Sequence, residues 1–225
     1  MTEIIPAILS GSFEEIQDSL SWLSEVAEYV QIDVADGRFV PNKTWPYVGD
    51  KGDFGEIKKE KKGLPFWEKL DFEADLMVRD PGSVVGDWIK AGADRIIIHL
   101  DSTTHDLIHD VLREWNHMAE FGIAISSRTD VEELSGFSEN ISFVQCMGIE
   151  RIGFQGQDFD AKIIAKIEEI KKRYPNKEVS VDGGVNRENI EDLLDAGVDR
   201  LVIGSAIIKS DNPIEEFEYF KSLVG

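Results

Sequence analysis

Short runs of β-branched and apolar residues alternate along this chain with longer stretches whose apolar residues recur at helical spacing. In runs such as YVQIDVA, polar and apolar positions alternate, which is typical of strands. Stretches such as SFEEIQDSLSWLSEVA and FDAKIIAKIEEIKKRY predict amphipathic helices. The pattern predicts eight strands, at residues 4–10, 29–35, 72–78, 95–100, 122–127, 141–147, 178–184 and 200–206.

Eight strands that each precede a helix predict a single-domain (β/α)8 TIM barrel over residues 1–225. The alternative, a doubly wound sheet, usually has fewer strands at this length. An internal repeat supports the barrel, because AGADRIII at 91–98 recurs as AGVDRLVI at 196–203, four units later. We expect two helices to start at Ser12 and Asn186, each of which stands three residues before a polar partner.

The connection after the second strand, residues 37–70, is an elongated loop or insertion by the standards of barrel loops. It contains Trp45, Phe66 and Trp67. Two interpretations stay open: the segment covers a site, or it packs against a neighbouring subunit. We expect a homo-oligomer.

Composition narrows the possible partners and the compartment. The formal net charge is −20, from 44 acidic and 24 basic residues, which argues against nucleic acid and anionic membranes as partners. The single cysteine, Cys146, lies in an apolar run and is interpreted as a core residue. The N-terminus lacks the features of a signal peptide, and no run reaches the length of a membrane span, so we expect a soluble cytoplasmic protein.

Three predicted strands carry an aspartate among apolar residues near their C-terminal ends: Asp33, Asp75 and Asp182. Barrel chemistry is located at those ends, and buried carboxylates are costly unless they are paired. No lysine or arginine lies on these three strands, so the carboxylates are expected to converge on a cation or on shared protons. The alternative is that they are solvated residues at loop edges. The sequence argues against a Schiff-base aldolase, because none of the eight strands carries a lysine.

Glycines follow the last three predicted strands, in GFQGQ, VDGG and IGSAI. Glycine allows backbone N–H groups to approach an anion closely, and barrels commonly bind phosphate at the loops after strands seven and eight. The alternative is that these glycines only make turns. The predicted phosphate-binding residues are Gly153, Gly156, Gly183, Gly184, Gly204 and Ser205.

The sequence resembles the ribulose-phosphate 3-epimerase family nearly from end to end. The resemblance rests on PAILSGSF, IDVADGRFVPN, LMVRDP, HLDST, GFQGQDF, VDGGVN and GSAII, in this order. It implies a barrel in pentose phosphate carbohydrate metabolism that epimerises C3 of a ketopentose 5-phosphate, such as D-ribulose 5-phosphate, through an enediolate. The catalytic residues implied are Asp33 and Asp182, which exchange protons on opposite faces of the substrate. A bound metal would stabilise the enediolate.

Several positions depart from the family pattern. Gln31 and Asp75 stand where the family has two metal-binding histidines. Ala7 replaces a serine, Ala35 replaces a methionine, and Gln155 stands where a glycine is expected in a loop that is also one residue longer. These changes indicate altered chemistry at the metal site.

Three hypotheses follow from these departures. The first is an isomerase whose metal ligands are Asp33, Asp75, Asp182 and Gln31, with Mg²⁺ or Mn²⁺ favoured over zinc or iron because all the donors are oxygen atoms. The second is a metal-free isomerase in which Asp75 shares a proton with another aspartate. The third is an inactive or altered-specificity barrel that only binds a phosphorylated sugar.

All four histidines of the chain lie between residues 99 and 117. His99 ends the fourth strand, where it either touches the substrate or is a structural residue of the pocket wall. His105, His109 and His117 are predicted to share one solvated face of the next helix, outside the barrel.

Overall fold

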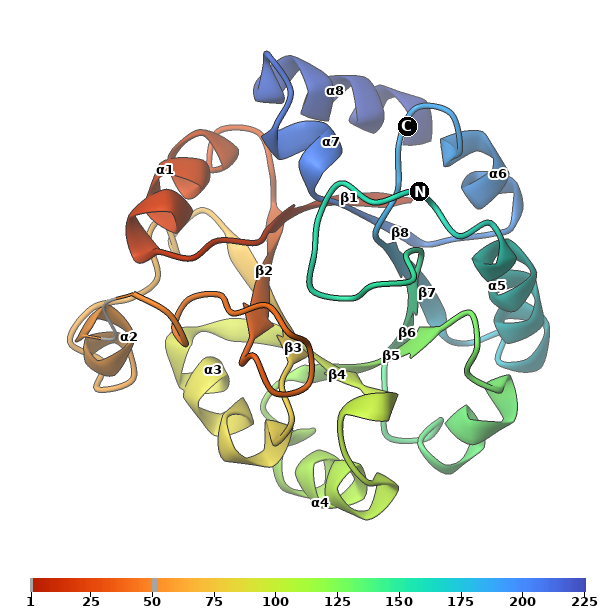
Figure 1. The fold of residues 1–225 in the computed structure, drawn as a ribbon, viewed down its shortest axis with the longest axis horizontal. Coiled ribbons are helices and arrows are strands. Elements are labelled where there is room, and N and C mark those ends of the chain that lie inside the picture. The colour runs from red at the N-terminus through yellow and green to blue at the C-terminus, as the bar shows by residue number, and fades with distance from the viewer. Residues whose placement is uncertain (1, 50–51) are drawn as a thin grey trace.

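The computed structural model describes residues 2–49 and 52–225. Within these ranges, eight parallel strands pair in chain order, and the last pairs with the first to close a barrel (Figure 1). The predicted (β/α)8 TIM barrel is confirmed. The strands are β1 (Glu3–Ile8), β2 (Tyr29–Ala35), β3 (Asp71–Met77), β4 (Ala93–His99), β5 (Glu120–Ser126), β6 (Phe143–Met147), β7 (Glu178–Asp182) and β8 (Arg200–Ile203).

Helices surround the barrel, as Figure 1 shows. One strand–helix unit differs from the prediction: in the described chain, the β5–β6 connection holds only the 3-10 helix η3 (Val131–Gly136). None of the helices formed by the described residues combines the length and the hydropathy of a membrane span. The α-helices are α1 (Phe13–Leu23), α2 (Gly52–Ile57), α3 (Val85–Ala91), α4 (His105–Trp115), α5 (Lys162–Arg173), α6 (Ile190–Asp195), α7 (Ser205–Ile208) and α8 (Pro213–Val224).

The predicted helix start at Ser12 is confirmed, because its hydroxyl accepts a hydrogen bond from the backbone N–H of Glu15 at 3.2 Å. The second predicted start is wrong. Asn186 accepts from the backbone N–H of Glu188 at 2.8 Å and so caps a turn, and α6 begins only at Ile190. An asparagine side chain can accept a hydrogen bond from a backbone N–H group in a turn as well as at the start of a helix. The spacing alone therefore did not distinguish a turn from a helix start.

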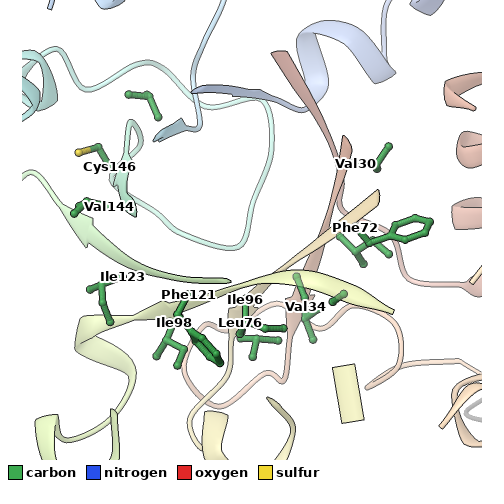
Figure 2. Packing of buried hydrophobic residues seen from close by; sticks show 14 of the residues in the cluster. Val30, Val34, Phe72, Leu76, Ile96, Ile98, Phe121, Ile123, Val144 and Cys146 are labelled. Carbon is green, nitrogen blue, oxygen red and sulfur yellow. The ribbon is translucent and has the colours of Figure 1, made fainter. Parts of the chain in front are cut away.

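The two faces of the barrel strands differ in polarity. The outward face is apolar: side chains of β2 to β6, among them Val34, Leu76 and Ile98, pack into one buried cluster (Figure 2). Cys146 belongs to this cluster, where burial raises the pKa of its thiol to about 12, so its interpretation as a core residue is confirmed. The inward face carries several buried polar side chains, including Gln31, Asp75, Gln145 and Asp182.

The two copies of the internal repeat lie at the barrel floor, the end of the barrel where the N-terminal ends of the strands lie. Their two glycines, Gly92 and Gly197, both have left-handed backbone conformations, with φ of 102° and 88°, that end a helix before the next strand. Three residues later the repeat places Arg95 on β4 and Arg200 on β8. Both guanidinium groups act on the buried carboxyl of Glu73 and lower its pKa, although burial raises that pKa more strongly.

The segment 37–70 contributes α2 and two members of an aromatic cluster, Trp45 and Phe54. Trp45 is 1% exposed, and its ring centroid lies 5.1–5.9 Å from those of Phe13, Phe54 and Trp88. Trp67, by contrast, is 62% exposed. Trp45 therefore packs in the layer outside the barrel, while both interpretations of the segment as a whole stay predictions.

Candidate active site

The carboxyl groups of Asp33, Asp75 and Asp182 lie together at the mouth of the barrel. Each contributes an oxygen atom, and these atoms all lie within 4.8 Å of one another. The side chains come from β2, β3 and β7, and none of the three residues is more than 9% exposed. They are therefore buried rather than solvated at loop edges. Parallel strands in a closed barrel turn such residues inward at one end, which explains the convergence.

The Gln31 side-chain amide connects two of these carboxyl groups. Its Nε2 donates to Asp33 Oδ1 at 2.7 Å and to Asp182 Oδ2 at 2.8 Å, which uses both of its hydrogens. Its Oε1 is buried and accepts no hydrogen bond from any residue in the described part of the chain. Gln31 thus presents its nitrogen, and not its oxygen, to the aspartates.

Burial and mutual repulsion favour protonated carboxyl groups in this cluster. Burial, together with the neighbouring charges of Asp182 and Asp75, raises the pKa of Asp33 well above its usual range. Burial and the charge of Asp75 raise the pKa of Asp182 to about 7, while the hydrogen bond from Gln31 opposes the rise. The cluster can therefore hold a proton at neutral pH, so that one carboxyl is an acid while another is a base.

The third aspartate has a basic partner that the sequence analysis did not foresee. His99 Nε2 lies 2.7 Å from Asp75 Oδ1, and both side chains are buried. Asp75 Oδ2 is also buried, and it has no hydrogen-bond partner among residues 2–49 and 52–225. His99 further packs against the Phe39 ring, at 5.5 Å between centroids. In this structure His99 is a buried partner of Asp75, and it is not among the residues that line the cavity described next.

A cavity of about 190 Å³ joins the aspartates to the glycine loops. This is small beside the roughly 300–1,000 Å³ of pockets for drug-sized ligands and favours a small polar molecule. Two of the glycines have left-handed conformations, Gly183 with φ of 98° and Gly184 with φ of 71°. A Cβ at Gly184 would lie 2.8 Å from a backbone carbon of Phe159, so only glycine fits there. The lining includes Asp33, Asp75, Asp182 and all the predicted phosphate-binding residues, namely Gly153, Gly156, Gly183, Gly184, Gly204 and Ser205.

The loop between β6 and α5 crosses the barrel mouth (Figure 1). Two side-chain amides attach it to other parts of the barrel. Asn42 Nδ2 donates to the Gly153 carbonyl at 2.8 Å, and Gln155 Nε2 donates to the Ala7 carbonyl at 3.2 Å. Two departures from the family pattern, Ala7 and Gln155, are therefore in direct contact.

Sequence reasoning missed Gln145. This residue lies on β6, is fully buried, and donates from Nε2 to Asp182 Oδ2 at 3.3 Å. The available signal was an amide in the apolar run ISFVQCMG, two residues before Met147 and hence on the same face of the strand.

The histidines after β4 lie apart from this cluster. His105 and His109 belong to α4 and pack against the ring of Phe137, with ring centroids at 5.2 and 4.5 Å. His117 is exposed and follows the end of the helix at Trp115, so the prediction that all three share one helix is wrong. The turn that ends α4 separates His117 from the other two.

Comparison with known proteins identifies the family. A family model described as the ribulose-phosphate 3 epimerase family matches residues 3–208. The chain is 31% identical over 212 residues to the ribulose-phosphate 3-epimerase of Treponema pallidum, covering 90% of this chain and 89% of that protein. It is 29% identical over 215 residues to that of Schizosaccharomyces pombe, covering 95% and 90%.

Solved structures agree on the fold. The crystal structure of KGPDC from Streptococcus mutans superposes with a TM-score of 0.75 at 13% identity, covering 98% of this chain and 96% of that one. The 3-hexulose-6-phosphate synthase from Salmonella typhimurium superposes with a TM-score of 0.71 at 16% identity, covering 99% and 98%. Together, the match over residues 3–208 and the similarity to the named epimerases mean that the chain belongs to the ribulose-phosphate 3-epimerase family.

Proposed function

We propose that this chain is an isomerase that epimerises C3 of a ketopentose 5-phosphate, interconverting D-ribulose 5-phosphate and D-xylulose 5-phosphate or a similar pair. The observation that carries the proposal is that Asp33 and Asp182 reach one cavity from strands that β1 and β8 separate. Inverting a stereocentre requires one acid–base group on each face of the carbon atom. The relatives named ribulose-phosphate 3-epimerase support the same reaction.

Proton transfer needs Asp33 and Asp182 in opposite protonation states. The charged carboxylate removes the C3 proton, the C–H electron pair forms the C2–C3 double bond, and the carbonyl π pair moves to the C2 oxygen. The other carboxyl then donates its proton to the opposite face of C3, where the C2–C3 π pair takes it while the electron pair on the C2 oxygen re-forms the carbonyl. The raised pKa values of both groups support this division, because one of them retains a proton at neutral pH.

The hydrogen bonds from Gln31 orient these two groups. Asp33 Oδ1 and Asp182 Oδ2 are both occupied by the same amide, so the remaining oxygen of each carboxyl is the one available to substrate. The glycine loops at Gly183 and Gly204 would hold the 5-phosphate through backbone N–H groups, without a compensating cation. Such neutral donors suit a chain with a net charge of −20.

The three aspartates also suit a divalent cation. Their clustered oxygens include the buried Asp75 Oδ2, which lacks a hydrogen-bond partner within the described ranges, and this donor set favours Mg²⁺ or Mn²⁺ over zinc or iron. When bound, such an ion would stabilise negative charge on the substrate oxygens. Gln31 would join the ligands only if its amide rotated to present Oε1, which would cost its two hydrogen bonds to the aspartates.

The alternative is a phosphosugar-binding barrel without epimerase activity. One observation favours it: Gln31 directs an amide N–H pair, rather than a metal ligand, at both aspartates. A pure binder would have no use for two opposed acid–base groups, which is why we rank the isomerase first.

Solvent-deuterium incorporation at C3 distinguishes these functions. The chain is incubated in D₂O with each 5-phosphate isomer, with Mn²⁺ or with chelator, and exchange is followed by NMR. We expect wild-type exchange and epimerisation, and we expect Asp33→Asn and Asp182→Asn each to abolish epimerisation. His117→Asn is the matched control and should match wild type, because this side chain is exposed and precedes the N-terminal end of β5, whereas the aspartates lie toward the C-terminal ends of their strands.

The metal condition gives a second result. Exchange only with added Mn²⁺ would establish the cation, and calorimetric binding of Mn²⁺ that Asp75→Asn abolishes would locate it. Exchange that survives chelation would favour the metal-free isomerase. Sugar-phosphate binding without exchange in either condition would favour the non-catalytic barrel and contradict the proposal.

A further inference from the structure

Gln145 is a buried amide in a strand whose other residues are mostly apolar. It is fully buried inside the barrel, where an amide is costly unless it is hydrogen-bonded. Its Nε2 donates to Asp182 Oδ2 at 3.3 Å and to the weak acceptor Met147 Sδ at 3.9 Å, and its Oε1 accepts from the hydroxyl of Ser180 at 3.5 Å. These contacts form a chain from Ser180 through Gln145 to Asp182.

The chain makes the two proposed acid–base groups unequal. Asp182 Oδ2 accepts from two amides, Gln31 at 2.8 Å and Gln145 at 3.3 Å. The Asp33 carboxyl accepts from only one amide among the described residues, that of Gln31. Two donors on one oxygen restrict rotation of the Asp182 carboxyl and leave its Oδ1 for the substrate.

We propose that Gln145 is a positioning residue for Asp182, and that Ser180 supports it. This inference rests on the proposed epimerase function and concerns the face of C3 that Asp182 serves. An apolar side chain of similar length, such as methionine, would fill the same space without the cost of burying an amide. The amide is therefore explained by what it does to Asp182, and not by packing.

Loss of Gln145 should affect only one of the two C3 isomers. When Asp182 is the base, it takes the C3 proton of one isomer, the C–H electron pair enters the C2–C3 double bond, and the carbonyl π pair moves to the C2 oxygen. The carbonyl then re-forms, and the C2–C3 π pair takes a proton from Asp33 on the other face. When Asp33 is the base, it takes the C3 proton of the other isomer. Loss of Gln145 should therefore slow exchange of the isomer that Asp182 deprotonates and spare the other.

The test measures C3 exchange from each isomer separately in D₂O. Asp182→Asn and Asp33→Asn first show which isomer depends on which aspartate. Gln145→Met should then slow exchange of the Asp182-dependent isomer about tenfold, the lower end expected for a lost hydrogen bond to a charged group. The isomer that depends on Asp33 should exchange at close to the wild-type rate.

Two further variants keep the result interpretable. Ser180→Ala removes only the support of Gln145 Oε1 and should slow the same isomer to a smaller extent; it decides the question if Gln145→Met does not fold. Cys146→Val is the matched control, because it changes the next residue of the same strand, whose buried side chain packs on the outer face of the barrel (Figure 2). It should slow neither isomer selectively.

Failure of the positioning role and failure of the epimerase function would give different results. Equal slowing of both isomers by Gln145→Met, or slowing of only the Asp33-dependent one, would overturn the positioning role while leaving the epimerase function intact. An unchanged rate for both isomers would do the same. A wild-type chain that exchanges neither isomer, with or without Mn²⁺, would overturn the epimerase function and this role with it.

Discussion

Replacing Glu73 by glutamine is expected to stabilise the folded chain above neutral pH and to leave its stability nearly unchanged in acid. Glu73 lies on β3 at the barrel floor and is 1% exposed. Neither of its carboxyl oxygens has a hydrogen-bond partner in the described part of the chain, and the nearest ion-pair contact is Arg95 Nη1 at 3.6 Å. Burial therefore outweighs the pull of Arg95 and Arg200 and raises the pKa of Glu73 to about 7.

The size and sign of the effect follow from this pKa. Each tenfold change in an ionisation constant corresponds to about 1.36 kcal/mol, so the rise from 4.5 to about 7 makes ionised Glu73 cost the folded state about 3 kcal/mol. Between these values the folded chain keeps a proton that the unfolded chain has lost. Wild-type stability therefore falls as pH rises through this window, and then levels off above about pH 7.

The assay is urea unfolding of wild type and Glu73→Gln at several pH values. The free energy of unfolding should be similar for the two proteins below about pH 4.5, and the variant should be more stable by about 3 kcal/mol at about pH 8. Asp33 and Asp182, whose raised pKa values act in the same direction, are present in both proteins, so most of their contribution cancels in the difference.

Glu120→Gln is the control for this experiment. Glu120 belongs to the same ion-pair network, 3.6 Å from Arg95 Nε and 3.9 Å from Arg200, but its side chain is 56% exposed. We expect an effect below about 1 kcal/mol, because exposed ion pairs contribute little to stability. A glutamine variant at position 73 that is less stable than wild type above neutral pH would refute the reasoning, because pairing with the arginines would then outweigh burial.

Three further substitutions test the fold and the site. Ser12→Ala removes the cap of α1 and should lower the free energy of unfolding by about 1 kcal/mol in urea. Gly122→Ala would place a Cβ 2.3 Å from the ring of Phe143 and should cost about 1–3 kcal/mol, seen as a lower melting temperature. Gly184→Ala adds a Cβ at a φ of 71° beside the proposed phosphate loop, and calorimetry should show weaker binding of D-ribulose 5-phosphate; unchanged affinity would count against a phosphate site there.

The pattern of polar and apolar residues along the chain was sufficient to locate the strands and to identify the three aspartates as candidate site residues. Short runs of β-branched and apolar residues, some of them alternating with polar residues, identified all eight strands, and the errors lay at their ends. The predicted seventh strand, for example, continued through residue 184, but Gly183 turns the backbone out of the strand conformation at a φ of 98°. The helix expected at Asn186 failed for a similar reason, because the side chain caps a turn instead.

The sequence by itself determined which residues stand at the strand ends, since strand periodicity and turn-forming glycines depend on neighbours in the chain. Only the tertiary structure decided their partners. Gln31 and Asp182 are 151 residues apart, and Asp75 and His99 are 24 apart, yet each pair is in hydrogen-bond contact. Barrel closure brings these side chains into one interior, where burial and mutual charge, which no local pattern encodes, set which groups hold a proton.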